Sequence, residues 1–295
     1  MRWAEGFIAV DWGTTNRRAY LIGSDGRRID DMEDGRGVLS VAKGEFPAAL
    51  GEITERLGDK PLLLAGMAGS TRGWMDAPYL PCPIGLRELA AELVWAEPGR
   101  AAIVPGASYT DEHHADIMRG EEVQILGASA AGEIPPDCTV CHPGTHNKWV
   151  EVTDGRIESF RTVMTGEMFS LLRNHSILSE HLQQPVEVGE AFRAGVSRGL
   201  AGGALTAELF SVRAKSLLGQ LGPKDAAPFT SGLLIGADVA AGVGTVSRDQ
   251  VIVMGSPKLT ALYAAALREA EREPVEMDGE QAFLAGAKRI VELIE

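Results

Sequence analysis

Little in this sequence ties the chain to an oxidising compartment, a membrane or an export route. Three cysteines are too few for a disulfide framework, which favours a reducing cytoplasm. No apolar run approaches the ~20 residues that a helix needs to cross a bilayer. Residues 1–5 also lack the long apolar segment of a signal peptide. We therefore expect a cytoplasmic protein that does not span a membrane.

Basic residues are scarce as well. The chain has 28 Lys and Arg against 41 Asp and Glu, a formal net charge of −13. That balance argues against a nucleic acid or an anionic membrane as a partner. An anionic substrate would need basic residues placed locally in its site. The motif G-x-x-x-x-G-K-[ST] is missing too, which argues against a P-loop enzyme.

The sequence does contain a repeated loop. The 295 residues are 45% hydrophobic and 23% charged, as in ordinary globular proteins with room for two domains. Gly13-Thr14-Thr15-Asn16-Arg17 and Gly144-Thr145-His146-Asn147-Lys148 share one pattern, and each lies between an apolar run and a strand-like run with an Asp-Gly turn. A β-turn-β-turn-β unit therefore occurs twice. Glycine admits a ligand close to the backbone and threonine adds a hydroxyl, so two such loops could hold a polyphosphate between domains.

Strand-like and helix-like segments alternate along the rest of the chain, which implies an α/β fold. The apolar patterns predict strands at 61–65, 101–104 and 251–254, and helices at 46–57, 86–94, 117–131, 167–221 (in pieces), 232–241, 255–268 and 283–294. Pro135-Pro136 ends the helix at 117–131, and we place a domain boundary there. The domains expected are 1–136 and 137–278, with the last helix, 279–295, free to pack back on the first.

Two further positions suit ligand chemistry. Asp11 follows a buried strand, at the edge where open α/β sheets bind ligands, and its carboxylate suits a hydrated Mg²⁺. A turn-capping aspartate is the alternative. Gly255-Ser256 lies at a strand-to-helix junction, where backbone N–H groups can receive a nucleotide. A plain connection between elements is the alternative there.

These segments resemble a known superfamily. Residues 11–19 resemble the first phosphate loop of the sugar-kinase/Hsp70/actin superfamily, close to the D-x-G-T-T of glycerol kinase-like enzymes. Gly144-Thr145 resembles the second phosphate loop, and Gly255-Ser256 the adenosine motif without its usual glycine doublet. The match is closer still to the 2-dehydro-3-deoxygalactonokinase family. Its supporting segments are residues 11–18, 66–70, 118–122, 143–149, 160–167 and 231–237.

The resemblance implies a fold and an activity. The fold is a two-domain actin-like ATPase (ribonuclease H-like) α/β fold with an interdomain nucleotide cleft. The activity is ATP- and Mg²⁺-dependent phosphorylation of 2-dehydro-3-deoxy-D-galactonate at its terminal (6-) hydroxyl, in galactonate catabolism. A kinase for another 2-keto-3-deoxy sugar acid and a non-catalytic sugar-acid sensor of the same fold stay open, as does a homodimer.

The resemblance also implies roles for residues. Asp11 holds the metal, and Glu121, after Gly120, occupies the place of the catalytic base. Glu122 is its neighbouring alternative, and both could instead form an acidic helix start. The ATP and phosphate contacts are Gly13, Thr14, Thr15, Asn16, Arg18, Gly144, Thr145, His146, Lys148, Gly255 and Ser256.

Residues after the strand at 61–65 occupy the place of the sugar contacts in related kinases. Gly66, Met67 and Ser70 are the candidates there. A keto acid also needs a cation for its carboxylate, and arginine offers a bidentate fit. Arg72 and Arg119 are candidates for that contact, and Lys148 could serve either the carboxylate or the transferred phosphoryl group.

Overall fold

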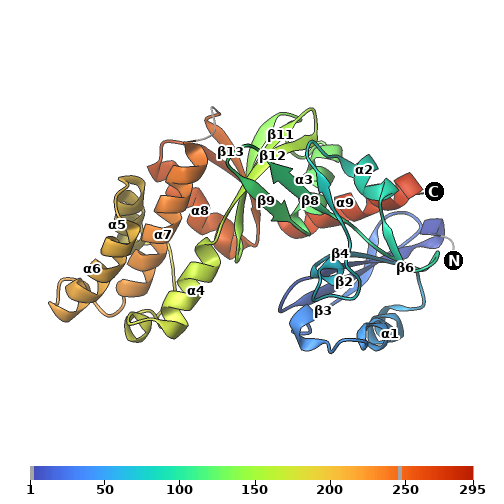
Figure 1. The fold of residues 1–295 in the computed structure, drawn as a ribbon, viewed down its shortest axis with the longest axis horizontal. Helices are drawn as coiled ribbons and strands as arrows, with labels where there is room; N and C mark the ends of the chain where they lie inside the picture. The colour runs from blue at the N-terminus through green and yellow to red at the C-terminus, as the bar shows by residue number, and fades with distance from the viewer. Residues whose placement is uncertain (1–2, 245–247, 295) are drawn as a thin grey trace. The chain divides into compact units, whose positions relative to one another are not determined.

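The computed structural model describes residues 3–244 and 248–294. The chain divides into two compact units (Figure 1). The first comprises Met1–Asp137, Val152–Ser159 and Glu280–Glu295, and the second comprises Cys138–Glu151 and Phe160–Gly279. Each unit combines a sheet with helices, so the expected α/β class is confirmed. The expected domain ranges, 1–136 and 137–278, stay a prediction.

The first unit is built on a six-stranded sheet. Its strands are β1 (Phe7–Trp12), β2 (Arg17–Ile22), β3 (Arg28–Asp34), β4 (Leu62–Gly66), β6 (Val94–Glu97) and β7 (Ala101–Ile103), in the order β3-β2-β1-β4-β7-β6. The first three form the predicted antiparallel meander, and β4 pairs parallel with β1. Helix α1 (Phe46–Leu57) buries Phe46, Ala49, Leu50, Ile53 and Leu57, the face that its periodicity predicted.

The remaining elements of this unit include a small sheet that the sequence did not predict. It contains β5 (Tyr79–Pro81), β8 (Gly106–Thr110) and β9 (Ala115–Met118). The helices are α2 (Leu86–Ala91), α3 (Glu121–Ala130) and α9 (Gly279–Ile294), with 3₁₀ turns η1 (Trp3–Glu5), η2 (Val38–Ser40) and η3 (Met67–Gly69). Helix α9 packs on α3 through Gly127 and Gly286, where any Cβ would overlap the facing backbone.

Two predicted helix boundaries were wrong. The helix expected at 117–131 begins at Glu121, because Ile117 belongs to β9 and Gly120 turns the chain with φ +109°. The helix expected at 86–94 ends at Ala91, and Val94 begins β6. Strands of three to five residues carry too little alternation to be told from helix ends by periodicity.

The five-stranded sheet, most of which lies in the second unit, repeats the topology of the first sheet. Its strands are β10 (Cys138–His142), β11 (Asn147–Thr153), β12 (Arg156–Val163), β13 (Gln250–Gly255) and β14 (Glu273–Asp278), in the order β12-β11-β10-β13-β14. The first four follow the same order as β3-β2-β1-β4, and β13 is parallel to β10 as β4 is to β1. The duplicated unit predicted from the two Gly-Thr loops is therefore confirmed.

The second unit also contains helices. They are α4 (Thr165–His175), α5 (Glu190–Leu200), α6 (Leu205–Leu217), α7 (Ala226–Val243) and α8 (Pro257–Glu269), with the 3₁₀ turn η4 (Ser179–His181). Helix α7 packs tightly on α5, because a Cβ on Gly232 or Gly236 would overlap the carbonyls of Phe192 and Val196. By length and composition α7 could cross a membrane, but 72% of its 18 residues are buried in the structure. That burial accounts for its apolar composition.

Candidate active site

The ends of two parallel strands and one helix meet beside Asp11. Gly66 ends β4 with φ +81°, and a Cβ there would lie 2.8 Å from the Trp12 carbonyl oxygen and 3.5 Å from Asp11 Oδ1. Gly120, the N-cap of α3, packs on Gly66, since its own Cβ would lie 3.2 Å from Gly66 Cα. These glycines let the start of α3 approach β1, which brings Glu121 close to Asp11.

The electrostatic surroundings of Asp11 agree with that proximity. Desolvation by the surrounding protein raises the pKa of the Asp11 carboxyl to about 6. The Arg18 guanidinium opposes this shift, and the Glu121 carboxylate adds to it. Two carboxylates therefore share one partly desolvated place, with one arginine near them. Such a place suits a divalent cation with oxygen ligands.

Glu121 and Glu122 have different surroundings although they are adjacent. The Glu122 side chain is 0% exposed, and the Gly120 N–H donates to both of its carboxylate oxygens at 2.8 and 2.7 Å. Burial, with the Glu121 charge, raises the pKa of Glu122 to about 8. Glu121 is partly exposed and accepts a 3.2 Å hydrogen bond from the Arg119 N–H. The arrangement favours Glu121 as the base, and its role stays a prediction.

The first Gly-Thr loop is a tight turn that the segment at Gly37 holds through backbone hydrogen bonds. The Gly13 N–H donates to the Asn16 carbonyl at 2.9 Å, and the Thr15 carbonyl accepts a 3.0 Å bond from Gly37 N–H. Gly37 is required because a Cβ there would overlap Thr14 and Thr15. The side chains of Thr14, Thr15 and Asn16 are left exposed, so they are available to phosphates.

The two arginines after this loop differ. Arg17 is 1% exposed and is engaged by Asp34 at 2.6 Å, by the Ala49 carbonyl and by Glu52. It is therefore a structural residue. Arg18 is partly exposed, and its Nε donates to Glu33 at 2.9 Å. Arg18 lies opposite Asp11 in the β1–β2 pair, and its charge lowers the pKa of Asp11. It therefore lies next to the candidate metal position.

The candidate sugar loop follows β4. Met67 is partly exposed, whereas Ser70 is buried and its hydroxyl donates to the Met67 carbonyl at 2.8 Å. Arg72 is exposed. Arg119 is 8% exposed: its Nη2 donates to the Ala77 carbonyl at 2.6 Å, and its guanidinium stacks 4.2 Å over Tyr79. Its Nε and Nη1 are buried and have no hydrogen-bond partner within the described part of the chain.

The second Gly-Thr loop is closed by the start of α4. The Glu167 N–H donates to the Thr145 carbonyl at 2.9 Å, and Glu167 Oε2 lies 2.5 Å from His146 Nε2. A Cβ on Gly166 would overlap the Gly144 carbonyl, so the loop and the helix fit only with glycine there. Thr145 and His146 are exposed, whereas Lys148 is 4% exposed and donates to the His146 carbonyl at 3.3 Å.

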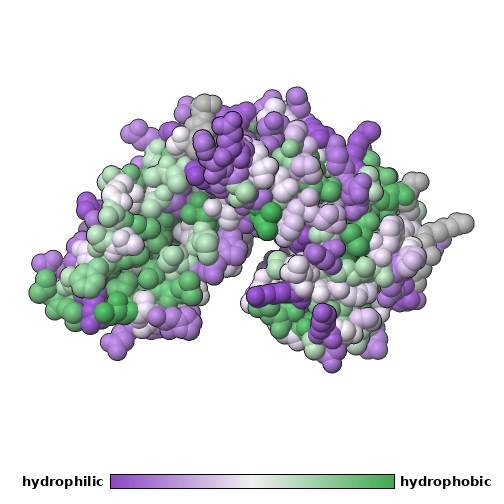
Figure 2. All heavy atoms as spheres, in the orientation of Figure 1, coloured by the Kyte–Doolittle hydropathy of each residue, from purple (hydrophilic) through white to green (hydrophobic). Residues whose placement is uncertain are grey.

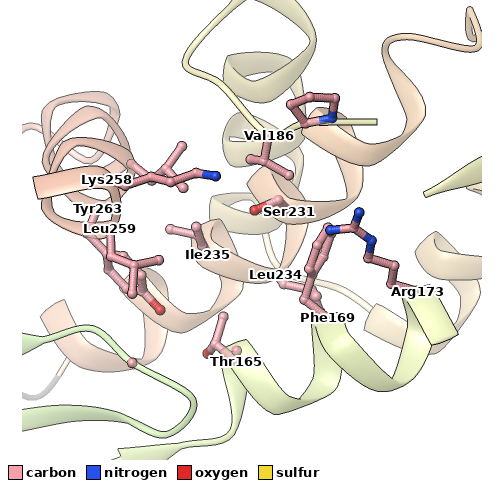
Figure 3. A pocket seen from close by; sticks show the side chains of 14 residues that line it. Thr165, Phe169, Arg173, Val186, Ser231, Leu234, Ile235, Lys258, Leu259 and Tyr263 are labelled. Atoms are coloured by element: carbon pink, nitrogen blue, oxygen red, sulfur yellow. The ribbon is translucent and has the colours of Figure 1, made fainter. Parts of the chain in front are cut away.

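A cavity of about 200 Å³ opens beside this loop, within the second unit (Figure 3). The residues that line it are Gly144, Thr165, Gly166, Phe169, Arg173, Pro185, Val186, Ser231, Leu234, Ile235, Lys258, Leu259, Leu262 and Tyr263. The amine of Lys258 and the guanidinium of Arg173 point toward each other across Ser231, above apolar walls. Since pockets for small ligands typically measure ~300–1,000 Å³, this cavity suits one part of a nucleotide.

The predicted adenosine residues lie next to this cavity. Gly255 ends β13, and Ser256 is the N-cap of α8, whose first turns supply Lys258 and Leu259 to the lining. The sequence did not predict the contributions of α4 and α7 to the cavity, nor that of Asp238, which bonds to residues of its walls. A single acid within the small, apolar run 226–243 was the available signal for Asp238.

Comparisons with known proteins all match this chain to one family. The family model described as 2-keto-3-deoxy-galactonokinase matches residues 11–290. The 2-dehydro-3-deoxygalactonokinase of Escherichia coli (strain K12) is 37% identical over 298 residues, which cover 98% of each chain. A crystal structure from Sinorhizobium meliloti that carries the same enzyme name superposes with a TM-score of 0.91 at 36% identity, over 98% of this chain and 99% of that one.

A distant structure supports the fold alone. The activator of 2-hydroxyisocaproyl-CoA dehydratase from Clostridium difficile, solved with ADPNP, has a TM-score of 0.51 at 11% identity, over 97% of this chain and 94% of that one. The two-domain, actin-like α/β fold expected from the sequence is thus confirmed. The match over residues 11–290, together with close relatives along nearly the whole length, shows that the chain belongs to the 2-keto-3-deoxy-galactonokinase family.

Proposed function

We propose that this protein transfers the γ-phosphoryl group of ATP to the terminal (6-) hydroxyl of 2-dehydro-3-deoxy-D-galactonate, a step of galactonate catabolism. The observation that carries the proposal is the family match over residues 11–290, which contains the Asp11 and Glu121 pair and both Gly-Thr loops. The enzyme names of the relatives supply the substrate. The acid pair supplies the groups that the reaction needs.

Glu121 is the proposed base. The hydroxyl oxygen of the sugar acid forms a bond to the γ-phosphorus, the bond from that phosphorus to the ADP oxygen breaks, and the hydroxyl proton passes to Glu121. A carboxylate accepts such a proton late, and its larger task is to orient the hydroxyl. Glu122 instead keeps Gly120 in place with its two hydrogen bonds, which fixes the start of α3.

Asp11 is the residue that would hold Mg²⁺, directly or through water. The fit rests on its surroundings: a partly desolvated carboxylate with a raised pKa and a second carboxylate near it. When bound, Mg²⁺ supplies positive charge that neutralises the phosphate oxygens. Arg18, beside Asp11, is the protein's own cation at that position.

The two Gly-Thr loops are the proposed phosphate contacts, and the cavity of the second unit receives the nucleoside. Apolar walls suit a base, while Lys258 and Arg173 supply positive charge at the cavity. The cavity adjoins the second loop through Gly144, which lines it.

The substrate carboxylate has two candidate arginines in the first unit. Arg72 is exposed after the Gly66–Ser70 loop and can offer its guanidinium directly. Arg119 is engaged by the Ala77 carbonyl and the Tyr79 ring, and the Ala77 N–H donates to the Gly69 carbonyl of that loop at 2.9 Å. We propose Arg72 as the direct contact and Arg119 as the residue that holds the loop.

The proposal is tested by a coupled ADP-release assay over a panel of 2-keto-3-deoxy sugar acids. We expect the highest kcat/KM with the galactonate-derived acid and a product phosphorylated at the terminal carbon, identified by ³¹P and ¹³C NMR. Higher kcat/KM with the gluconate epimer would favour a kinase for another sugar acid. Ligand binding without ADP release would favour the sensor.

We also propose that the protein works in a reducing cytoplasm and as a homodimer. Its cysteines, Cys82, Cys138 and Cys141, are free thiols. Helix α6 and the residue after it expose Phe210, Leu217 and Leu218 on an apolar surface (Figure 2), and a second copy would cover such a surface. Light scattering of the wild type and of a Leu217→Lys variant tests the dimer.

A further inference from the structure

One buried carboxylate connects four elements of the second unit. Asp238, on α7, is 2% exposed. Its oxygens accept hydrogen bonds from Asn147 Nδ2 at 3.0 Å, Trp149 Nε1 at 2.8 Å, Thr165 Oγ1 at 2.5 Å and Tyr263 OH at 2.6 Å. The donors come from β11, α4 and α8. The carboxylate therefore joins the strand after the second loop to three helices.

The chemistry of these partners fixes where their protons lie. An indole and an amide N–H can only donate, and an ionised carboxylate can only accept. Each of the four donors is neutral, and together they match the roughly four lone-pair sites of one carboxylate. The hydroxyl protons of Thr165 and Tyr263 are consequently committed to Asp238.

Thr165 and Tyr263 also line the cavity beside the second loop (Figure 3). Because their protons are turned inward, each hydroxyl has only oxygen lone pairs left for a ligand. This part of the cavity wall accepts hydrogen bonds and cannot donate them. A ligand group seated there must be a donor, and a carbonyl or ether oxygen in the same place would face lone pairs.

We propose that Asp238 is a positioning residue that makes this wall of the nucleotide cavity select a hydrogen-bond donor of the nucleoside. The inference rests on the proposed function, because it takes the cavity as the nucleoside site. The donor is a ribose hydroxyl or the exocyclic amine of adenine. Both present the same chemistry to Thr165 and Tyr263, and analogues that lack one or the other distinguish them.

The test measures binding of ADP, 2′-deoxy-ADP, 3′-deoxy-ADP and IDP by calorimetry. For the wild type we expect one analogue, the one that lacks the donor, to bind about 2- to 12-fold more weakly than ADP, the loss of one hydrogen bond. In Asp238→Asn the amide N–H₂ turns a hydroxyl proton back toward the cavity. Binding of ADP should then weaken while binding of that analogue does not, so the discrimination between them disappears. KM for the sugar acid should stay within about twofold of the wild-type value.

Two further variants keep the test independent of folding. Tyr263→Phe and Thr165→Val each remove one hydroxyl acceptor from the cavity wall and leave three partners on Asp238. At least one of them should erase the same discrimination. Thr230→Val is the matched control: Thr230 is buried on the same helix and bonds only the Ala226 carbonyl in the described structure. It should lower the melting temperature without changing the ratio of ADP to analogue affinity.

The outcomes separate the inference from the proposed function. If the wild type binds ADP but treats all four nucleotides alike, or if its discrimination survives in Asp238→Asn, Tyr263→Phe and Thr165→Val, the inference is overturned and the kinase proposal stands. If the wild type binds no ADP, both are overturned. A loss of discrimination in Thr230→Val would also overturn it, because general loosening of α7 would then explain the effect.

Discussion

Replacing Glu121 by Gln removes basicity and charge from the site while keeping the shape of the side chain. Glu121 begins α3, is partly exposed and accepts a hydrogen bond from the Arg119 N–H. The glutamine carbonyl can accept the same bond, so we expect the start of the helix to stay in place. The change therefore tests the chemistry of the carboxylate and leaves the fold intact.

The magnitude follows from two effects. Loss of a general base typically costs 10²–10⁴ in kcat, roughly 2.7–5.4 kcal/mol of activation free energy. The second effect acts on Asp11, whose pKa of about 6 is raised partly by the Glu121 charge. Without that charge the pKa of Asp11 falls, so its carboxylate is ionised to a lower pH. One negative charge also leaves the neighbourhood of the phosphates, so binding of ATP should be unchanged or tighter.

The assay measures steady-state rates of ADP release from about pH 5 to pH 9. We expect kcat of Glu121→Gln to fall 10²–10⁴-fold while KM for ATP does not rise. In the absence of Mg²⁺, the pKa of Asp11 should be about 6 in the wild type and lower in the variant, as followed by NMR titration of the carboxyl group. Glu122→Gln is the matched control, because it changes the adjacent acid that faces the interior.

Wild-type turnover in Glu121→Gln would refute the assignment of Glu121 as the base. Loss of turnover in Glu122→Gln alone would move the base by one residue, against the burial of that side chain. A raised KM for ATP in Glu121→Gln with unchanged kcat would mean that Glu121 binds nucleotide or metal and takes no proton.

Four further predictions address stability, loop packing, substrate recognition and motion. The folded pKa of Glu122 is about 8 against an ordinary 4.5, so the free energy of unfolding of the wild type should fall by up to ~1.4 kcal/mol per pH unit between those two values and level off at higher pH. In urea unfolding at pH 5 and pH 8, Glu122→Gln should lack this decline. Equal pH dependence in both proteins would refute this prediction. Gly37→Ala should cost ~1–3 kcal/mol through overlap with Thr14 and Thr15 and raise KM for ATP, whereas Gly35→Ala, with nothing within 4 Å of its Cβ, should change neither. Arg72→Ala should raise KM for the sugar acid about 10- to 150-fold, the loss of one charge-assisted contact, and leave KM for ATP alone; equal effects on both would assign Arg72 another task. The two units should close when ATP analogue and sugar acid bind together, because an open site would hydrolyse ATP, and identical X-ray scattering profiles with and without the ligands would count against closure.

The sequence predicted the repeated strand-and-loop architecture. Alternating patterns and turn residues are local signals, and they predicted both meanders, helix α1 and the long strands on either side of each Gly-Thr loop. They predicted less about short elements. Strands β5, β8 and β9 were missed because a strand of three to five residues has almost no period to detect.

The site divided in the same way. Motif spacing found the loops and the pair Glu121-Glu122, but only packing showed that Glu122 is buried and that Glu121 lies near Asp11. Packing also showed that Arg17 is buried and bound to Asp34, whereas Arg18 is partly exposed. Roles of this kind depend on partners far away in the chain, and one sequence does not record them.

The sequence by itself determined the α/β class, the duplicated β-turn-β-turn-β unit and the loops that can approach a polyphosphate, because glycine, threonine and hydrophobic periodicity act over a few residues. The tertiary structure decided which side chains point inward, how Gly66 and Gly120 bring a helix to the end of a strand, and how Asp238 gathers donors from β11, α4 and α8. Burial and hydrogen-bond saturation arise only when distant segments meet. They therefore become visible only in the folded chain.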